Sequence, residues 1–326
     1  MAQELIVVAG GGGFIGGQIV RDLLRKGHRV RSVDIKPVTE WWQVFDEADN
    51  VVTDLRLKAS CEQACAGAAT VYQLAADMGG MGFIEHNKAL CMLSVLINTH
   101  MLEASVSVGV QRFFYASSAC VYNADKQADT RVVPLKEGDA YPAMPEDGYG
   151  WEKLFSERMC RHFMEDFGLQ TRVARLHNVY GPHGTWDGGR EKAPAAICRK
   201  VIDAKVRGRH SIEIWGDGQQ TRSFQYIDDC VYGAQAILAS DITEPINLGS
   251  SELVTINGLV DIAEDIAGIR VERRYNLSAP KGVNGRNSDN TKILSLLGWE
   301  PSTRLRDGLE RTYSWIFDEY TRRARA

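Results

Sequence analysis

The chain has 326 residues, of which 44% are hydrophobic and 25% charged, and this composition is typical of a globular protein with a sizeable core. Its formal net charge of −4 gives no overall basic field, which argues against a nucleic-acid-binding protein. Seven cysteines with no CxxC pair argue against a disulfide framework and against a zinc or other metal site.

Targeting features are also missing from the pattern. A short apolar run begins almost at once, without the charged and apolar regions of a signal peptide. We find no apolar run of about 18 residues and therefore expect no membrane helix. The unpaired cysteines suit a reducing compartment, so we expect a cytoplasmic protein.

Strand and helix patterns alternate through about the first 175 residues. Short apolar runs without strict alternation predict strands buried on both faces, at 5–9, 29–34, 70–75 and 112–116. Helical patterns follow or separate them, at 14–26, 87–108 and 149–167. This order predicts an α/β fold with a Rossmann-type doubly wound parallel sheet.

The pattern changes after residue 175. Loops rich in glycine, histidine and tryptophan are expected at 177–186 and 215–220. Further helices are expected at 227–239, 255–267 and 304–320. We expect residues 1–175, with part of 223–250 returning, to form an NAD-binding domain. Residues 176–222 and 251–326 would then form a smaller mixed α/β lobe for the substrate.

A glycine-rich segment marks the expected cofactor site. Gly10, Gly13 and Gly16 form GxxGxxG between a strand and a helix that begins with Phe14 and Ile15. Such glycines let the backbone approach a pyrophosphate at the N-terminus of the helix. A structural glycine turn is the alternative interpretation.

Two carboxylates are expected near the adenosine half of the cofactor. Asp34 ends the second strand 18 residues after Gly16, where a carboxylate binds both ribose hydroxyls and repels a 2′-phosphate. We therefore predict NAD rather than NADP, although Lys36 nearby could weaken that preference. Asp54 is expected to cap the next helix and to contact adenine.

Tyr149 and Lys153 predict chemistry on a hydroxyl group. Their four-residue spacing puts both on one face of a helix, where Lys153 would lower the pKa of the tyrosine. Tyr149 could then take a proton from an alcohol while hydride leaves. A YxxxK pair is often only a surface pair, but here Ser117 and Ser118 end an intervening strand.

The glycine loop, the segment 73–76 (QLAA), Ser117-Ser118 and YxxxK together resemble the extended short-chain dehydrogenase/reductase family. This family includes nucleotide-sugar epimerases, dehydratases and decarboxylases. The resemblance implies tightly bound NAD, with Leu74 in its site, and a C-terminal lobe that binds a nucleotide-sugar. It also implies a homodimer in which helices 87–108 and 149–167 pair with their counterparts.

Five further stretches resemble one subgroup of epimerases that act on a GDP-sugar: 77–83, 115–120, 188–196, 215–222 and 285–290. The resemblance implies that Ser118 assists Tyr149, that Cys120 and Lys192 are an acid/base pair, and that Arg286 binds the diphosphate or positions the sugar. The other positions implied in substrate binding are Gly79, Asn178, Glu191, Lys200, Gln220 and Arg222.

The chemistry explains why such an enzyme needs two extra proton carriers. Oxidation of sugar carbon 4 to a ketone acidifies the C–H bonds at carbons 3 and 5, because each anion is an enolate. Inversion then requires one group to remove a proton and another to deliver one to the opposite face. Cys120 suits the base, and Lys192 suits the acid if Arg190, Lys200 and Arg286 lower its pKa.

Other interpretations remain. A nucleotide-sugar 4-epimerase would leave Cys120 and Lys192 idle, and a 4,6-dehydratase would need a carboxylate after Ser118, where the sequence has Ala119 and Cys120. A non-catalytic NAD sensor would not need an intact Tyr149–Lys153 pair. Free cysteines are usually packed in the core, as we expect for Cys61 and Cys65. His177 and His183 are expected to make hydrogen bonds rather than to catalyse.

Overall fold

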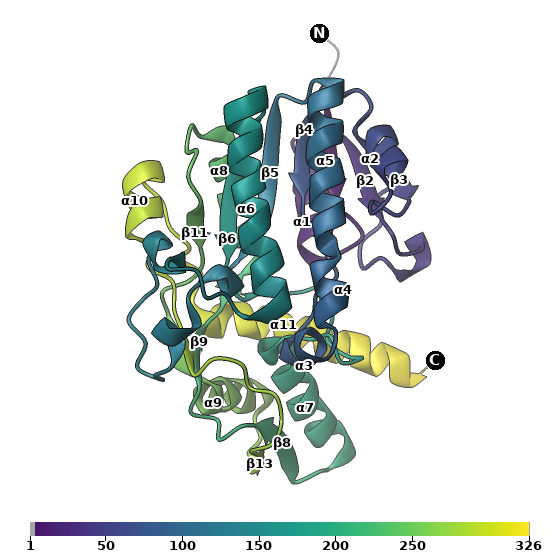
Figure 1. The fold of residues 1–326 in the computed structure, drawn as a ribbon. Helices are drawn as coiled ribbons and strands as arrows, with labels where there is room; N and C mark the ends of the chain where they lie inside the picture. The colour runs from purple at the N-terminus through teal and green to yellow at the C-terminus, as the bar shows by residue number, and fades with distance from the viewer. Residues whose placement is uncertain (1–3, 326) are drawn as a thin grey trace.

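A seven-stranded parallel sheet forms the centre of the computed structural model, which describes residues 4–325. The strand order is β11-β6-β5-β4-β1-β2-β3, the doubly wound arrangement predicted from the sequence (Figure 1). The strands are β1 (Leu5–Ala9), β2 (Arg29–Asp34), β3 (Asp49–Val52), β4 (Ala68–Gln73), β5 (Arg112–Ser118), β6 (Gln170–Leu176) and β11 (Ile246–Leu248). All of these neighbours pair in parallel.

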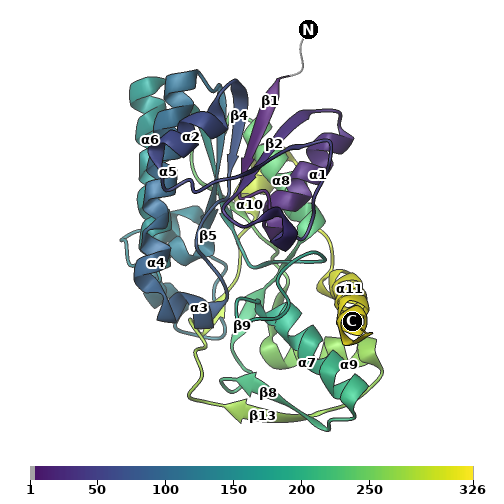
Figure 2. The same ribbon diagram turned by 90° about the vertical axis from the view of Figure 1, so that its right-hand side faces the viewer.

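Helices cover both faces of the sheet. One face carries α1 (Phe14–Arg25) and α8 (Ile227–Ala239), and the other carries α2 (Lys58–Cys65), α5 (Ser94–Val108) and α6 (Asp147–Phe167) (Figure 2). Strand β1 shows why its apolar run does not alternate with polar residues. Ile6 and Val8 join the apolar cluster under α1 and α8, whereas Val7 and Ala9 join the cluster under α2, α5 and α6.

The long helix expected at 87–108 is interrupted. It consists of α4 (Lys88–Met92) and α5, and Leu93 lies between them as the C-cap of the first and the N-cap of the second. Contrary to the expectation from the sequence, Lys88–Val108 is long and apolar enough to span a membrane by length and composition. However, α5 packs on α2, α6 and β4, and buries Met101 and Leu102 in the core, as a helix of a globular α/β layer does.

The C-terminal lobe is built around α7 (Ala193–Arg207), α9 (Ile256–Ala267) and α11 (Leu305–Arg325), which pack on one another. Beside them, β8 (Ser211–Trp215) pairs in parallel with β13 (Glu272–Asn276). The apolar cluster under α1 and α8 continues into this lobe through Ile197, Leu259 and Leu309, so one core joins both parts. Within 223–250, α8 and β11 lie with the sheet, and β11 pairs with β6.

Shorter elements connect these layers. A three-stranded sheet has the order β12-β9-β14, and β7 pairs with β10. The bounds are β7 (Val179–Tyr180), β9 (Thr221–Ser223), β10 (Gln225–Tyr226), β12 (Leu253–Thr255), β14 (Gly285–Arg286), α3 (Met81–His86) and α10 (Thr291–Leu297). The 3₁₀ helices are η1 (Val38–Glu40), η2 (Ala119–Val121), η3 (Ala124–Gln127) and η4 (Glu137–Ala140).

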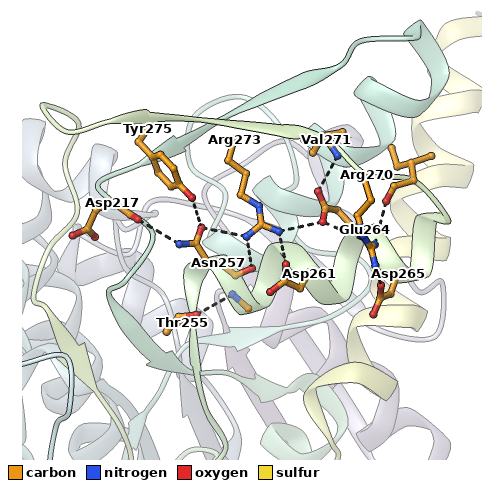
Figure 3. A network of polar contacts seen from close by, with 12 residues as sticks. Asp217, Thr255, Asn257, Asp261, Glu264, Asp265, Arg270, Val271, Arg273 and Tyr275 are labelled. Carbon is orange, nitrogen blue, oxygen red and sulfur yellow. Dashed lines mark hydrogen bonds and ion pairs between the residues drawn. The ribbon is translucent and has the colours of Figure 1, made fainter.

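A polar network fastens β13 to α9 at the far edge of the lobe (Figure 3). The guanidinium of Arg273 binds the carboxylates of Asp261 and Glu264, and its Nη2 lies 3.1 Å from Glu264. Glu264 is buried and also accepts a hydrogen bond of 3.0 Å from the backbone N–H of Val271. This network was not predicted, because its members are brought together by the tertiary fold.

Glu264→Ala should lower the free energy of unfolding by about 2–3 kcal/mol, because a partly buried guanidinium and a backbone N–H both lose their acceptor. The measurement is the midpoint of urea unfolding. Asp261→Ala is the matched control, because its exposed carboxylate binds the same guanidinium and should cost under about 1 kcal/mol. Equal losses in both variants would contradict the assignment.

Candidate active site

The glycine loop has the geometry that a pyrophosphate requires. Gly10 has φ +85°, and a Cβ there would lie 2.9 Å from the backbone nitrogen of Ala75. A Cβ on Gly16 would overlap the carbonyl oxygen of Gly10. Gly13 is the N-cap of α1, and the helix has no side-chain cap. The N–H groups of the first turn, including those of Phe14 and Ile15, are therefore available to an anion.

Asp34 lies where a ribose-binding carboxylate is expected. It is buried at the end of β2, and one oxygen accepts a hydrogen bond of 3.0 Å from the backbone N–H of Lys36. The Lys36 ammonium turns back to the carbonyl oxygen of Gly12, at 2.8 Å. Leu74 lies at the same edge, and its N–H binds the carbonyl of Ala9 at 3.0 Å. These residues fit a dinucleotide with a free 2′-hydroxyl.

The expectation that Asp54 caps the next helix is wrong. The N-cap of α2 is Leu57, three residues later, and no side chain caps this helix. The carboxylate of Asp54 instead binds the guanidinium of Arg56, at 2.7 Å, and this hydrogen bond holds the pKa of Asp54 below its usual value. The short spacing lets Arg56 fold back on Asp54 before the helix begins.

Helix α6 holds Tyr149 and Lys153 one turn apart and buried. The Tyr149 hydroxyl lies beside the side chain of Ser118, which acts to lower its pKa. A Cβ on Gly150 would overlap the carbonyl oxygen of Cys120, so this glycine allows α6 to approach the end of β5 closely. The structure thus brings Tyr149, Lys153 and Ser118 together, as predicted.

The pKa of Tyr149 in the protein alone is raised, contrary to the expectation from the sequence that it is lowered. Burial raises the pKa of Tyr149 well above its usual value, and the charges of Cys120 and Glu152 raise it further. The Lys153 ammonium lies 5.6 Å from the centre of the Tyr149 ring, 4.9 Å from that of Tyr115, and 3.8 Å from Glu152. The neighbouring carboxylate therefore offsets much of its charge.

The two adjacent serines have different surroundings. Ser118 points to Tyr149, and its oxygen also accepts a hydrogen bond of 3.2 Å from the N–H of Cys120. Ser117 instead binds Glu157, two turns further along α6 than Tyr149 and the buried partner of Arg175. Only Ser118 therefore belongs to the site.

Cys120 lies just beyond β5 and is enclosed by charged groups. Its Sγ accepts a hydrogen bond from Arg286 Nη1 at 3.6 Å, and the carboxylate of Glu146, which binds the same guanidinium, lies beside it. Burial, followed by the charge of Glu146, raises the pKa of the Cys120 thiol to about 11, although Arg286 opposes the rise. Tyr149 and Cys120 share one buried cluster with Cys91 and Ile84.

Glu146 was missed in the sequence analysis. Its Oε2 lies 2.7 Å from Arg286 Nη2, and Arg286 Nε donates to Gln127 Oε1 at 2.6 Å. Burial raises the pKa of Glu146, but Arg286 more than offsets that effect, and the net pKa is lowered. The sequence signal was a carboxylate three residues before Tyr149, which identifies neither partner.

Lys192 is the N-cap residue of α7. Burial and the charge of Arg286 lower the pKa of its ammonium, and the charge of Cys120 opposes them. The predicted tuning by Arg190 and Lys200 is absent: Arg190 stacks on Phe83, and Lys200 donates to the carbonyl of Glu213 at 2.7 Å. Among residues 4–325, the Lys192 side chain has no hydrogen bond or ion pair.

The remaining predicted substrate residues form three groups. Glu191 binds Arg199 at 3.0 Å, and the segment containing Gly79 packs beside it, because the N–H of Gly80 binds the carbonyl of Arg190. Gln220 donates a hydrogen bond to the Trp215 carbonyl at 2.8 Å, so Gln220 and Lys200 both bind the backbone of β8. The Gln220 Oε1 atom is buried and has no hydrogen-bond partner among residues 4–325. Asn178 and Arg222 donate hydrogen bonds to backbone carbonyls. Burial, together with the charge of Arg286, lowers the pKa of Arg222 to about 10.

Neither histidine has the surroundings of an acid or base. His177 is fully buried and contacts Asn247 at 3.0 Å, and burial lowers its pKa to about 3. His183 packs on Trp315, with ring centroids 5.3 Å apart. Cys61 and Cys65 are buried in the core, as predicted. Within residues 4–325, no cluster of acidic, histidine and cysteine side chains could hold a metal ion.

Comparisons with known proteins agree with this geometry. The model of the NAD dependent epimerase/dehydratase family matches residues 6–249. The chain is 47% identical over 315 residues to GDP-mannose 3,5-epimerase 1 of Oryza sativa subsp. japonica, covering 96% of this chain and 82% of the relative. It is 46% identical over 320 residues to GDP-mannose 3,5-epimerase of Arabidopsis thaliana, with the same coverage.

Solved structures show the same fold. UDP-glucose 4-epimerase of Thermotoga maritima, solved with UDP-glucose, is 26% identical with a TM-score of 0.86, over 97% of this chain and 99% of that one. UDP-glucuronic acid 4-epimerase of Bacillus cereus, solved with UDP-glucuronic acid and NAD, is 25% identical with a TM-score of 0.82, over 97% and 100%.

Asp34→Ala should weaken NAD binding by about tenfold or more, because it removes charge-assisted hydrogen bonds to the ribose, and it should favour NADP relative to NAD. Titration of both nucleotides into protein stripped of cofactor measures this effect. Asp54→Ala is the control carboxylate, because Asp54 already binds Arg56, and it should change NAD affinity less. Equal losses in the two variants would contradict the role of Asp34.

Proposed function

Since this chain belongs to the NAD-dependent epimerase/dehydratase family, we propose that it is an isomerase that epimerises GDP-α-D-mannose at carbons 3 and 5 to give GDP-L-galactose. Inversion at carbon 5 alone gives GDP-L-gulose. Two relatives that are 46–47% identical over 96% of the chain carry the name GDP-mannose 3,5-epimerase. The observation that carries the proposal is the position of Cys120, Arg286 and Lys192 beside Tyr149 and Ser118.

The first task of the site is to move the proton of the carbon 4 hydroxyl. NAD, when bound, accepts hydride from carbon 4 and returns it at the end, so it is not consumed. Tyr149 takes the hydroxyl proton, and the neighbouring Ser118 hydroxyl assists by stabilising the phenolate. Lys153, one turn further along α6, keeps a cation near the developing phenolate.

The second task is to invert a carbon next to the new ketone. Cys120 removes the proton from carbon 5, and Lys192 delivers one to the opposite face. Arg286 favours both steps, because its charge stabilises a Cys120 thiolate and lowers the pKa of Lys192. The lowered pKa makes Lys192 a readier proton donor than an exposed lysine.

A nucleotide-sugar 4-epimerase is the second candidate, because the two solved structures described above are 4-epimerases of UDP-sugars at 25–26% identity. That reaction uses the tyrosine but leaves Cys120 and Lys192 without a task. A 4,6-dehydratase is less consistent with the site, because Ala119 and Cys120 follow Ser118 and supply no carboxylate there.

The two epimerase candidates differ in their isotope labelling. Incubation with GDP-mannose in deuterated water should place deuterium at carbons 3 and 5 of a new L-sugar, as followed by NMR. Cys120→Ala and Lys192→Met should each slow inversion at carbon 5 by about 10²–10⁴-fold.

Cys61→Ser serves as the control for the cysteine substitution, because it alters a buried cysteine outside the site and should leave labelling unchanged. Label at carbon 5 only would restrict the activity to a single centre. Product with no carbon-bound deuterium would favour the 4-epimerase.

We also propose that the protein is a homodimer that pairs through α4–α5 and α6. These helices lie side by side (Figure 1), and they expose large apolar side chains: Met92, Leu93, Leu96, Trp151 and Phe155. An exposed apolar patch on two neighbouring helices suits a two-fold interface in which the same face meets itself.

The double substitution Leu96→Glu and Phe155→Glu should convert the dimer to a monomer, because it places charges in the apolar interface. Light scattering at micromolar concentration measures the mass. Leu277→Glu, at an exposed position in the C-terminal lobe, should leave the mass unchanged. A monomeric mass for the unsubstituted protein would contradict the proposal.

A further inference from the structure

Glu146 and Cys120 both bind the guanidinium of Arg286, at 2.7 Å and 3.6 Å. Its backbone is fixed as well, because the N–H of Glu146 donates to the carbonyl oxygen of Cys120 at 2.9 Å. Glu146 is the N-cap residue of α6, so its position is tied to that of Tyr149 three residues later. The carboxylate is therefore held at a fixed place beside the thiol.

The other side of Glu146 faces a cavity. A space of about 500 Å³ is lined by Glu146 together with residues of α3, α4 and the segment 281–283. Gly282 lies against Glu146 Oε1, since a Cβ on this glycine would be 3.3 Å from that oxygen. Glu85, His86, Lys88 and Asp147 line the same cavity and are exposed, so the cavity opens to solvent.

Cys120 is only 8% exposed and does not line this cavity. A Cys120 thiolate that removes a proton from a sugar becomes a thiol. This thiol must lose its proton to solvent before the next cycle. Glu146 has one oxygen at Arg286 and the other toward the cavity, and its carboxylate lies beside the thiol because both groups bind the same guanidinium. It is thus the polar group that connects Cys120 with the solvent side.

We propose that Glu146 is a positioning residue that orients the Cys120 thiol and exchanges its proton with water in the adjoining cavity. This inference rests on the proposed epimerase function and adds a residue to it. In the exchange, the S–H bond of Cys120 breaks and an O–H bond forms on Glu146. Glu146 then gives this proton to a cavity water, and a solvent proton returns by the reverse steps. No electrons are transferred, and the charge of the pair is restored.

The charges around the pair favour this arrangement. Arg286 lowers the pKa of Glu146, so the carboxylate stays ionised between transfers and readily passes an accepted proton on to water. The groups that face the pair are Arg286, Arg222, Tyr149, Lys192 and the Ser118 hydroxyl, and on the cavity side Glu85, His86, Lys88, Asp147 and Lys281. Because Glu146 raises the pKa of Cys120, it also keeps the resting thiol protonated.

Deuterium exchange separates this role from a structural one. When GDP-mannose is incubated in deuterated water, label enters the remaining GDP-mannose at carbon 5 only if Cys120 removes a proton, exchanges it and returns a deuteron to the same face. Label in the product comes instead from Lys192 on the opposite face. The ratio of substrate label to product label therefore reports exchange at Cys120.

Glu146→Gln should lower this ratio by about tenfold, because the amide cannot carry the proton. Glu85→Gln is the matched control, since it removes a carboxylate from the same cavity without contact to Cys120, and it should leave the ratio unchanged. An unchanged ratio in Glu146→Gln, or an equal loss of both labels, would overturn the inference. Absence of label with the unsubstituted enzyme would instead reject the proposed function.

If the Glu146→Gln variant makes too little product for its label to be measured, a second measurement tests the inference. Alkylation of Cys120, followed on its own peptide by mass spectrometry between pH 7 and 9.5, reports the thiolate fraction. Since Glu146 raises the pKa of Cys120 and Arg286 remains, the variant should react several-fold faster at each pH. Equal or slower alkylation in a variant with an unchanged circular dichroism spectrum would overturn the inference.

Discussion

The ion pair between Arg286 and Glu146 joins the two parts of the molecule at the point where the chemistry takes place. Arg286 belongs to β14 in the small three-stranded sheet, and Glu146 begins α6 on the central sheet. Because both side chains are largely buried, neither can leave the other without exposing an uncompensated charge to the interior. The position of β14 is therefore coupled to that of α6, and with it to Tyr149 and Cys120.

The parallel sheet explains why the remaining groups meet at the same place. The carboxyl ends of β1, β2, β4 and β5 lie at one edge, so Gly10, Asp34, Leu74 and Ser118 are neighbours despite their separation along the chain. Gly150 then allows α6 to approach the end of β5, which brings Tyr149 to Ser118. The cofactor site and the hydroxyl-handling site therefore share one edge of the sheet.

Much of this arrangement could be predicted from local patterns. The apolar runs identified the strands, the glycine spacing identified the turn before α1, and the four-residue spacing identified the shared face of Tyr149 and Lys153. The patterns were wrong about the boundaries of two helices. Asp54 binds Arg56 instead of capping α2, and the helix 87–108 breaks at Leu93.

Glu146 illustrates the limit most clearly. A carboxylate before a helix is usually a solvated capping residue, and only the tertiary position of Arg286, 140 residues later, makes it part of the site. The pKa values of Tyr149 and Cys120 were also beyond prediction from spacing. Burial is the largest cause of both shifts, and burial is a property of the whole fold.

Ion pairing distinguishes the cations that hold the site together from Lys192, which gives up a proton. Three buried cations each have a largely buried carboxylate within 4 Å: Lys153 with Glu152, Arg175 with Glu157, and Arg286 with Glu146. Paired in this way, they hold their neighbours in place. Lys192 has no such partner among the described residues, and burial and Arg286 destabilise its charge. An ammonium left unpaired beside paired ones can give up its proton at low cost, which is the property that an acid for carbon 5 requires.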